Sequence, residues 1–260
     1  MSSRGAIGIA ASVPRPGPWA AFGDDLRVLT ALVRGSRGRG DQAERLERFY
    51  APQAEAYDRF RERLLHGRGE LIAALPLPPG GTLVELGGGT GRNLEFAGAR
   101  LPALGASHIV DLCPSLLARA QARADAAGWT NVVCHQADAT SWQPPAPADA
   151  VLLSYALTMI PDWEAALANA VAMLKPGGWL GVVDFFVSHN DPGIGRVRHG
   201  AFARWFWPRW FGHDGVRPEP RHLDRLHELV NCRALIESEA AVPYLRLRAP
   251  FYRFLGVRRG

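Results

Sequence analysis

A glycine-rich turn carries the residues of this chain that are best suited to hold a ligand. Residues 85–93 read ELGGGTGRN; they follow a short apolar segment and precede a segment compatible with a helix. A turn made of glycines lets a ligand lie against bare backbone, and the start of a helix offers unpaired N–H groups and a positive potential. Glu85, at the end of the predicted strand, can accept hydrogen bonds from a ligand. The pattern indicates a binding site, although a tight structural turn would read the same way.

Two further carboxylates end later predicted strands. Asp111 lies 24 positions after Gly87, which is about the offset expected for a carboxylate that binds both ribose hydroxyls. Asp138 ends the next strand. Each carboxylate also has a purely structural interpretation: Asp111 can cap the helix that begins near Pro114, and Asp138 can close a turn.

The elements that position these residues alternate between strand and helix. We predict strands over residues 83–86, 107–110, 131–135, 150–154 and 179–186, and helices over 93–99, 114–127 and 162–174. Such alternation predicts a mostly parallel sheet with helices on both faces, in which ligands bind beyond the carboxyl ends of the strands. Two last strands, 232–240 and 251–257, follow a helix over 218–229. The segment 187–216 between them and the sheet is expected to be irregular.

The glycine spacing is E-x-G-x-G-x-G rather than the dinucleotide pattern G-x-G-x-x-G, because position 92 is arginine. This order resembles motif I of the class I S-adenosylmethionine (SAM)-dependent methyltransferases. The resemblance implies a Rossmann-like seven-stranded sheet with a terminal antiparallel strand, SAM as cofactor and S-adenosylhomocysteine as product. It also implies that Asp111 binds the ribose and that Asp138 accepts from the adenine amino group. The cofactor-binding residues it implies are Glu85, Gly87, Gly88, Gly89, Gly91, Asn93, Asp111, Leu112, Asp138, Ala139, Ser154, Tyr155 and Arg68.

Composition limits the remaining possibilities. The chain has 260 residues, 47% of them hydrophobic, which suits one α/β domain with insertions. The formal charge of +5 fits an anionic partner, either nucleic acid or a lipid surface, but a basic composition alone does not separate the two. The three cysteines have no paired spacing, and His108 and His135 have no ligand spacing, so we expect no metal.

The same patterns predict how the chain divides into segments. We interpret residues 1–23 as a flexible leader rather than a signal peptide. Residues 24–79 are expected to form N-terminal helices that cap the site, including one over 24–33. Residues 80–260 form the SAM-binding domain, with a substrate insertion at about 187–230. No apolar run is long enough to span a membrane.

The choice of methyl acceptor depends on two segments. A DNA amino-methyltransferase would carry a proline pair after the fourth strand, and residues 154–163 have none, which argues against nucleic acid. Six aromatic residues interleaved with arginines occupy 202–211. Buried, they form a small aromatic core; exposed, they form a wedge for a membrane interface.

Several stretches resemble the bacterial N-methyltransferases that convert diacylglyceryl-homoserine into the betaine lipid diacylglyceryl-trimethylhomoserine. These stretches are 48–54 through 57–58 to 67–68, 85–93, 111–117, 154–163, 182–185, 206–207 with 210–211 and 214, 242–244 and 250–254. The resemblance covers about residue 25 to the end. It implies three successive methylations of a lipid headgroup amine by a cytoplasmic protein at the anionic inner face of the membrane, with no metal and no nucleic acid.

The acceptor chemistry suggests further candidates. An aromatic wall tolerates every methylation state, since cation–π attraction needs no N–H. We take Tyr155, Tyr57 and Tyr252 as candidates for that wall or for orienting the amine, and His213 and Asp214 as candidates for proton removal. Trp205, Trp207, Trp210 and Arg253 are candidates for substrate binding, and Arg68 for the SAM carboxylate. Each of these also fits a structural role. Two other functions stay open: a small-molecule or quinone methyltransferase, and a SAM-binding protein without catalysis.

Overall fold

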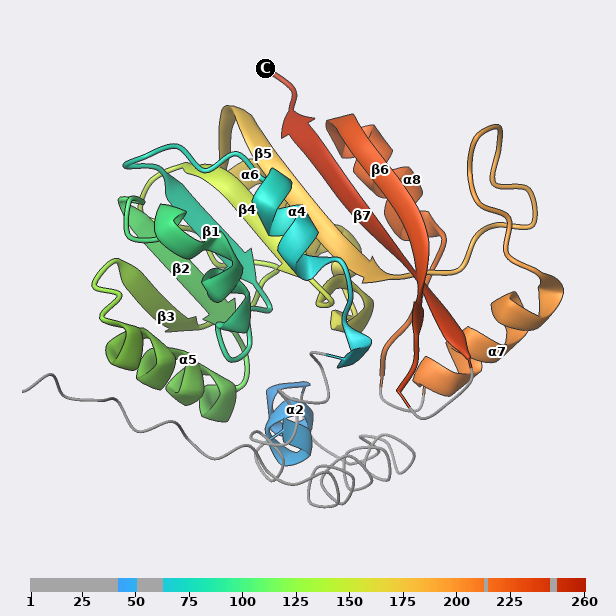
Figure 1. Cartoon of the computed structure of the whole chain (residues 1–260), viewed down its shortest axis with the longest axis horizontal. Coiled ribbons are helices and arrows are strands. Elements are labelled where there is room, and N and C mark those ends of the chain that lie inside the picture. The colour runs from blue at the N-terminus through green and yellow to red at the C-terminus, as the bar shows by residue number, and fades with distance from the viewer. Residues whose placement is uncertain (1–41, 51–62, 213–214, 244–246) are drawn as a thin grey trace, which may run out of the picture.

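A computed structural model gives the architecture and describes residues 42–50, 63–212, 215–243 and 247–260 (Figure 1). The expected leader and the helix over 24–33 lie outside these residues, as do Tyr57, His213 and Asp214. The order of elements is α2 Gln42–Tyr50, α4 Arg68–Ala74, β1 Thr82–Leu86, the 3-10 helix η2 Arg92–Arg100, β2 Ala106–Asp111, α5 Pro114–Ala127, β3 Val132–Gln136, β4 Ala148–Ser154, the 3-10 helix η3 Leu157–Met159, α6 Trp163–Met173, β5 Leu174–Phe185, α7 Ala201–Gly212, α8 Arg221–Leu229, β6 Val230–Ala241 and β7 Arg248–Arg258.

The strands form one seven-stranded sheet in the order β3-β2-β1-β4-β5-β7-β6. Strands β1 to β5 pair in parallel, and only β7 runs antiparallel to its two neighbours, β5 and β6. This confirms the predicted fold class. The order reverses between β1 and β4, and ligands bind at such a switch point in open α/β sheets.

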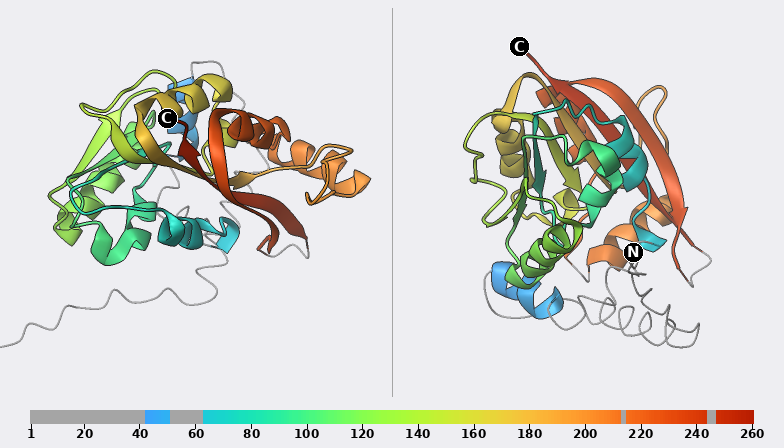
Figure 2. Two further views of the ribbon diagram at one scale, coloured as in Figure 1. Left: turned by 90° about the horizontal axis from the view of Figure 1, so that it is seen from above. Right: turned by 60° about the vertical axis from the view of Figure 1, so that its left-hand side comes forward.

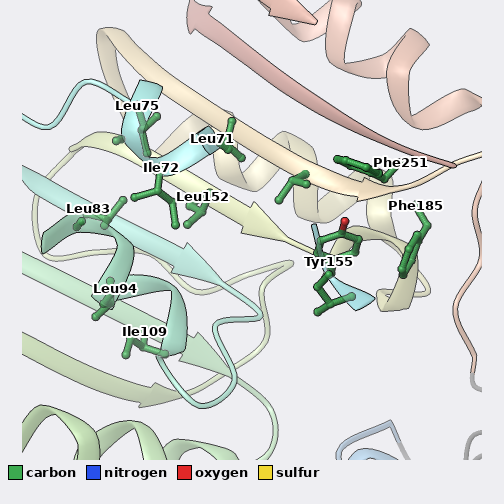
Figure 3. Packing of buried hydrophobic residues seen from close by; sticks show 14 of the residues in the cluster. Leu71, Ile72, Leu75, Leu83, Leu94, Ile109, Leu152, Tyr155, Phe185 and Phe251 are labelled. Atoms are coloured by element: carbon green, nitrogen blue, oxygen red, sulfur yellow. The ribbon is translucent and has the colours of Figure 1, made fainter. Parts of the chain in front are cut away.

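Helices cover both faces of the sheet. Seen from above, α6 and α8 lie on one side of the strands and α4, η2 and α5 on the other (Figure 2). One apolar cluster joins Leu71 and Ile72 of α4 to Leu83, Ile109 and their neighbours (Figure 3). A second cluster packs the opposite face against α6 and α8. Because both faces are covered, the central strands are apolar almost throughout rather than alternating.

Local signals fix the ends of the helices. Pro114 begins α5 and Gly128, in the left-handed conformation, ends it. The side chain of Asp162 accepts a hydrogen bond from the backbone N–H of Ala165 at 3.2 Å and so caps α6, as the sequence predicts.

Two expectations about secondary structure were wrong. The segment after the glycine turn is a 3-10 helix, Arg92–Arg100, with a kink at Gly98, whose positive φ interrupts the helical path. The segment 187–216 is not irregular throughout, because it contains helix α7. The aromatic residues of α7 lie on both of its sides and Pro208 lies inside it, so no apolar stripe marks the helix in the sequence.

Candidate active site

A cavity of about 340 Å³ lies at the carboxyl ends of β1 to β4. We call it the strand-end cavity. Its lining is Gln42, Gly87, Gly89, Val110, Asp111, Leu112, Leu116, Ala137, Asp138, Ala139, Thr140, Tyr155, Ala156, Met159, Ile160, Pro161 and Asp162. The volume lies in the range of small-molecule sites, and the mixture of apolar walls with a few carboxylates is typical of them.

The glycine turn has no room for side chains. Gly87, at a φ of 67°, would place a Cβ atom 2.5 Å from the Cβ of Ala156. Gly91, at a φ of 66°, would place one 2.8 Å from Ile109. Both the positive φ and the close approach demand glycine. The backbone of the turn is therefore bare on the side that faces the cavity.

Asp111 organises the cavity floor. One of its carboxylate oxygens accepts the backbone N–H of Gly89 at 2.9 Å, and the other accepts the N–H of Cys113 at 2.9 Å. The carboxylate thus joins the glycine turn to Cys113, the residue before α5, but it does not cap the helix, because α5 has no side-chain cap. It also lines the cavity, and a carboxylate is an acceptor of the kind that the two hydroxyls of a ribose need.

Asp138 likewise both stabilises the local backbone and lines the cavity. Its Oδ1 accepts both the backbone N–H and the hydroxyl of Thr140 at 2.8 Å, which closes a turn, while the residue lines the cavity together with Ala139. Leu112 and Ala139 are both in the lining, so apolar atoms are available on either side of a flat ring.

Glu85, Asn93 and Arg68 form a buried polar group beneath the turn. The Asn93 amide donates to Glu85 at 2.5 Å, and the Arg68 guanidinium donates to Asn93 at 3.1 Å and to the Leu65 carbonyl at 3.0 Å. These three side chains are buried and do not line the cavity. In this structure they brace the turn, and a direct contact with a cofactor stays a prediction, as it does for Gly88, Gly91 and Ser154, which also lie outside the lining.

Tyr155 lines the cavity in a strained conformation. It is the non-glycine residue with positive φ (52°) in the described part of the chain, and its hydroxyl donates to the His66 carbonyl at 2.8 Å. Burial raises the pKa of this phenol well above its usual range. The hydroxyl is therefore held as a hydrogen-bond donor and is not poised to take up a proton. What Tyr155 presents to the cavity region is an aromatic ring whose position is fixed.

Rings continue outward from Tyr155 in steps of 4.4–6.2 Å between centroids. We call this the aromatic series; its members in order are Tyr155, Phe185, Phe211, Trp207, Phe206, Phe202 and Trp205. Tyr155 and Trp207 are buried, whereas Phe202 and Trp205 are 63% and 54% exposed. Residues 202–211 thus contain both buried and exposed aromatic side chains, and a wedge for a membrane interface stays a prediction.

The other proposed substrate residues are placed less favourably. Tyr252 is fully buried, packs against Phe186 and does not line the cavity, so an acceptor bound there does not reach it. Arg253 and Trp210 are half-buried on β7 and α7 and lie outside the lining. A role in acceptor binding stays a prediction for these two.

The sequence analysis used residues 154–163 to judge the methyl acceptor but named no site residue among Met159, Ile160 and Pro161, which line the cavity. Asp184 holds this segment from within the core: it accepts the backbone N–H of Thr158 at 3.0 Å and its hydroxyl at 2.7 Å. Burial raises the pKa of this carboxyl to about 6, although these hydrogen bonds pull it down.

Helix α2 is fastened over the same end of the sheet. Glu47 accepts hydrogen bonds from the Cys113 thiol and from the backbone and hydroxyl of Ser115, at the start of α5. Burial opposes its ionisation, but the hydrogen bonds outweigh burial and lower its pKa. Gln42 donates to the Met159 carbonyl at 3.1 Å. That the N-terminal helices over 24–79 cap the site stays a prediction.

The chain resembles known methyltransferases. Residues 83–178 match the protein family described as "Methyltransferase domain". The fold is that of a class I SAM-dependent methyltransferase. The mitomycin 7-O-methyltransferase MmcR shares it at 18% identity and a TM-score of 0.64, over 94% of this chain and 74% of that one. The N-methyltransferase NodS from Bradyrhizobium japonicum, solved with S-adenosyl-L-homocysteine, shares it at 18% identity and a TM-score of 0.50, over 77% and 87% of the two chains.

Among curated sequences, a trans-aconitate 2-methyltransferase from Methylobacterium radiotolerans is 29% identical over 126 residues. The match covers 48% of this chain and 46% of the relative, so the chain spans about half the length of the curated relatives it matches. SAM is the cofactor of the methyltransferase domain, and the strand-end cavity fits it: bare glycine backbone, a carboxylate for a ribose and apolar walls for a ring all converge there. Among the described residues, no group of three or more His, Cys, Asp or Glu side chains is arranged to hold a metal ion.

Proposed function

We propose that this protein transfers methyl groups from SAM to the amine of a lipid headgroup, in three successive steps that convert diacylglyceryl-homoserine into diacylglyceryl-trimethylhomoserine. The observation that carries the proposal is the aromatic series, which links a ring at the cavity to rings on the surface. A lipid-borne amine must reach the cofactor while its acyl chains stay in an apolar phase, and a run of aromatic side chains suits both demands.

Bound SAM supplies a methyl group that is already activated by its sulfonium, so the protein's contribution is placement. Each transfer needs a neutral amine, so one proton leaves the nitrogen before each methyl arrives. An α-amino group has a pKa near ~8, and partial desolvation makes its neutral form accessible without a strong base. The raised pKa of Tyr155 and its donation to His66 fit this scheme, in which the ring orients the amine and the phenol does not ionise.

The aromatic wall also accounts for repeated methylation. A wall that recognised the amine through N–H donors would lose its contacts as methyl groups replace hydrogens. A ring such as that of Tyr155, which lines the cavity and packs on Phe185 at 4.7 Å between centroids, attracts a cationic nitrogen in every methylation state. A product distribution that proceeds to the quaternary ammonium is therefore expected.

A second candidate is a small-molecule methyltransferase, which the names of the curated relatives favour. An acceptor with several carboxylates calls for arginine or lysine at the site. The described lining of the strand-end cavity contains three aspartates and no lysine, arginine or histidine. This charge pattern suits a cationic cofactor and an amine better than a polycarboxylate.

The test is an incubation with methyl-labelled SAM and vesicles that contain diacylglyceryl-homoserine. We expect label in the lipid phase, with mono-, di- and trimethylated products resolved by mass spectrometry. A parallel incubation offers soluble amines and carboxylic acids. Label only in a soluble product would favour the second candidate. S-adenosylhomocysteine binding without any transfer would identify a SAM-binding protein instead.

A further inference from the structure

Helix α7 carries large aromatic side chains on two opposite sides. Trp207 and Phe211, four residues apart, are buried against the aromatic ring of Phe185 and its neighbours. Phe202, Trp205 and Arg209 follow one another at spacings of three and four residues, which places them on one side of the helix. We call these three the outer face of α7. Phe202 and Trp205 are more than half exposed.

The charges on this helix have one sign. Residues 201–212 include two arginines, Arg204 and Arg209, and no acidic residue. The Arg209 guanidinium lies 5.0 Å from the centre of the Trp205 ring and donates to the Trp205 carbonyl at 3.0 Å. The cation is thus held beside an exposed ring, and Arg198, also exposed, precedes the helix. Exposed aromatic rings with adjacent arginines are the pattern of interfacial helices, whose rings enter the headgroup region while the cations meet phosphates.

Helix α7 projects at one end of the molecule, beside the ends of β6 and β7 and away from the bulk of the sheet (Figures 1 and 2). A flat surface can therefore approach its outer face. No helix of the described residues is long and apolar enough to cross a membrane, so contact with a bilayer would be made from one side.

The small size of the outer face favours a lipid surface over a protein partner. An aromatic side chain offers about 150–250 Å² in total, so two that are half exposed offer roughly 200–300 Å². A stable protein interface needs about 800 Å² from each partner. Insertion into a headgroup region needs only a few aromatic anchors combined with attraction to anionic lipids.

We propose that the outer face of α7 docks on an anionic lipid bilayer. The surface end of the aromatic series then lies in the headgroup region and its inner end at the strand-end cavity. The docking proposal rests on the proposed function in one respect, because docking would give a lipid-borne acceptor a route out of the membrane plane. The docking itself is measured without any methyl transfer, so the two can fail separately.

The experiment is flotation of the full chain with phosphatidylcholine vesicles, with and without phosphatidylglycerol. We expect binding to the anionic vesicles that weakens as salt is raised. Replacing both outer aromatics (Phe202→Ser with Trp205→Ser) should lower binding by about tenfold for each side chain. The matched control is Val133→Ser, which replaces a 44% exposed apolar residue on β3 at the other edge of the sheet and should bind like the unaltered chain.

Folding of the double variant is checked by S-adenosylhomocysteine affinity, which should be unchanged because neither residue lines the cavity. A milder variant, Trp205→Phe, should keep vesicle binding and reduce the quenching of tryptophan fluorescence by brominated lipids. Equal flotation of the unaltered chain and the folded double variant would overturn the proposal. The proposal would also be overturned if the unaltered chain did not bind vesicles but formed a dimer that the double variant could not form. If the chain binds vesicles but does not methylate the lipid, the docking proposal is supported and the proposed function is wrong.

Discussion

The two halves of the sheet present different kinds of side chains near their carboxyl ends. Strands β1 to β4 present directional groups: the carboxylate of Asp111 is fixed by the backbone N–H groups of Gly89 and Cys113, and that of Asp138 by Thr140. Strand β5 and helix α7 present rings packed on rings, from Tyr155 through Phe185 to Phe202. Directional hydrogen bonds suit a cofactor whose shape stays constant. Aromatic rings suit an acceptor amine that changes with each methyl group, because cation–π attraction does not depend on N–H donors.

Similarity to known proteins follows the same division. The family match ends at residue 178, and so covers β1 to β4 and stops before α7 begins. Substitutions made in one half at a time should therefore have different effects on cofactor binding and on methyl transfer.

The largest effect is expected from Gly87→Ala. The new Cβ would lie 2.5 Å from the Ala156 Cβ at a φ of 67°, so the turn must shift away from the cavity. We expect S-adenosylhomocysteine affinity to fall by about 100-fold or more, which is about 3 kcal/mol, measured by calorimetry. Gly128→Ala is the control: it has the same backbone strain at a φ of 68° but no atom within 4 Å of the new Cβ. A similar loss of affinity in both variants would contradict the role of close approach.

Asp111→Asn should weaken S-adenosylhomocysteine binding by about 10- to 100-fold. The amide group would face one of the backbone donors that the carboxylate now satisfies, and a charged hydrogen bond contributes about 1.5–3 kcal/mol. Asp149→Asn is the matched control, because its carboxylate accepts from Thr82 and Lys175 rather than from the glycine turn. Unchanged affinity in the Asp111 variant would remove this residue from the cofactor site.

The pH dependence of stability should differ between the buried carboxylate of Asp184 and the partly buried carboxylate of Asp149. Burial raises the pKa of Asp184 from 3.8 to about 6. Its contribution to stability is therefore complete below pH 3.8 and is lost as the pH rises through about 6, by on the order of 3 kcal/mol. Asp184→Asn does not titrate, so thermal melts across pH 4 to 7 should lose this downward slope.

Asp149 behaves in the opposite sense. Burial opposes its ionisation, but hydrogen bonds from Lys175 and Thr82 outweigh burial and lower its pKa. Its contribution is present above pH 3.8 and is lost as the pH falls through its folded-state pKa. Melts of Asp149→Asn should therefore differ from those of the unaltered chain mainly above that range. Parallel slopes for the two variants would contradict both assignments.

The smallest effect is expected from Tyr155→Phe. It removes the hydrogen bond to the His66 carbonyl, about 1 kcal/mol of stability, but keeps the ring. Methyl transfer should stay within about threefold of the unaltered rate. Tyr155→Leu removes the ring, and the fraction of trimethylated product should fall more than the first methylation does. Loss of all transfer in the Phe variant would show that the hydroxyl acts chemically.

The glycine turn and the strand-end carboxylates could be located from the sequence because their signals are local. A glycine needed for positive φ, such as Gly87, and a proline that begins a helix, such as Pro114, each act within a few residues of themselves. The carboxylates at strand ends follow from topology, since the carboxyl ends of parallel strands meet at one edge of the sheet. Periodicity and turn residues therefore placed Asp111 and Asp138 before any coordinates did.

The half with β5 and α7 was harder to read because its arrangement depends on packing between distant segments. Nothing near Tyr252 in the sequence shows that it is buried beside Phe186 and away from the cavity, whereas Tyr155 lines the cavity. The helical state of 201–212 was missed because its aromatics cover two sides. The anchoring of Thr158 by Asp184, 26 positions away, has no local signal at all.

The antiparallel strand β7 has a consequence for the order in which the molecule is built. It follows β6 in the chain yet lies between β5 and β6, so β6 has no strand to pair with until β7 emerges. Strands β1 to β5 can pair during synthesis, before that point. A nascent chain therefore passes through a stage in which the five parallel strands can be paired while β6 is not, and S-adenosylhomocysteine added during translation would be expected to protect the paired strands from proteases.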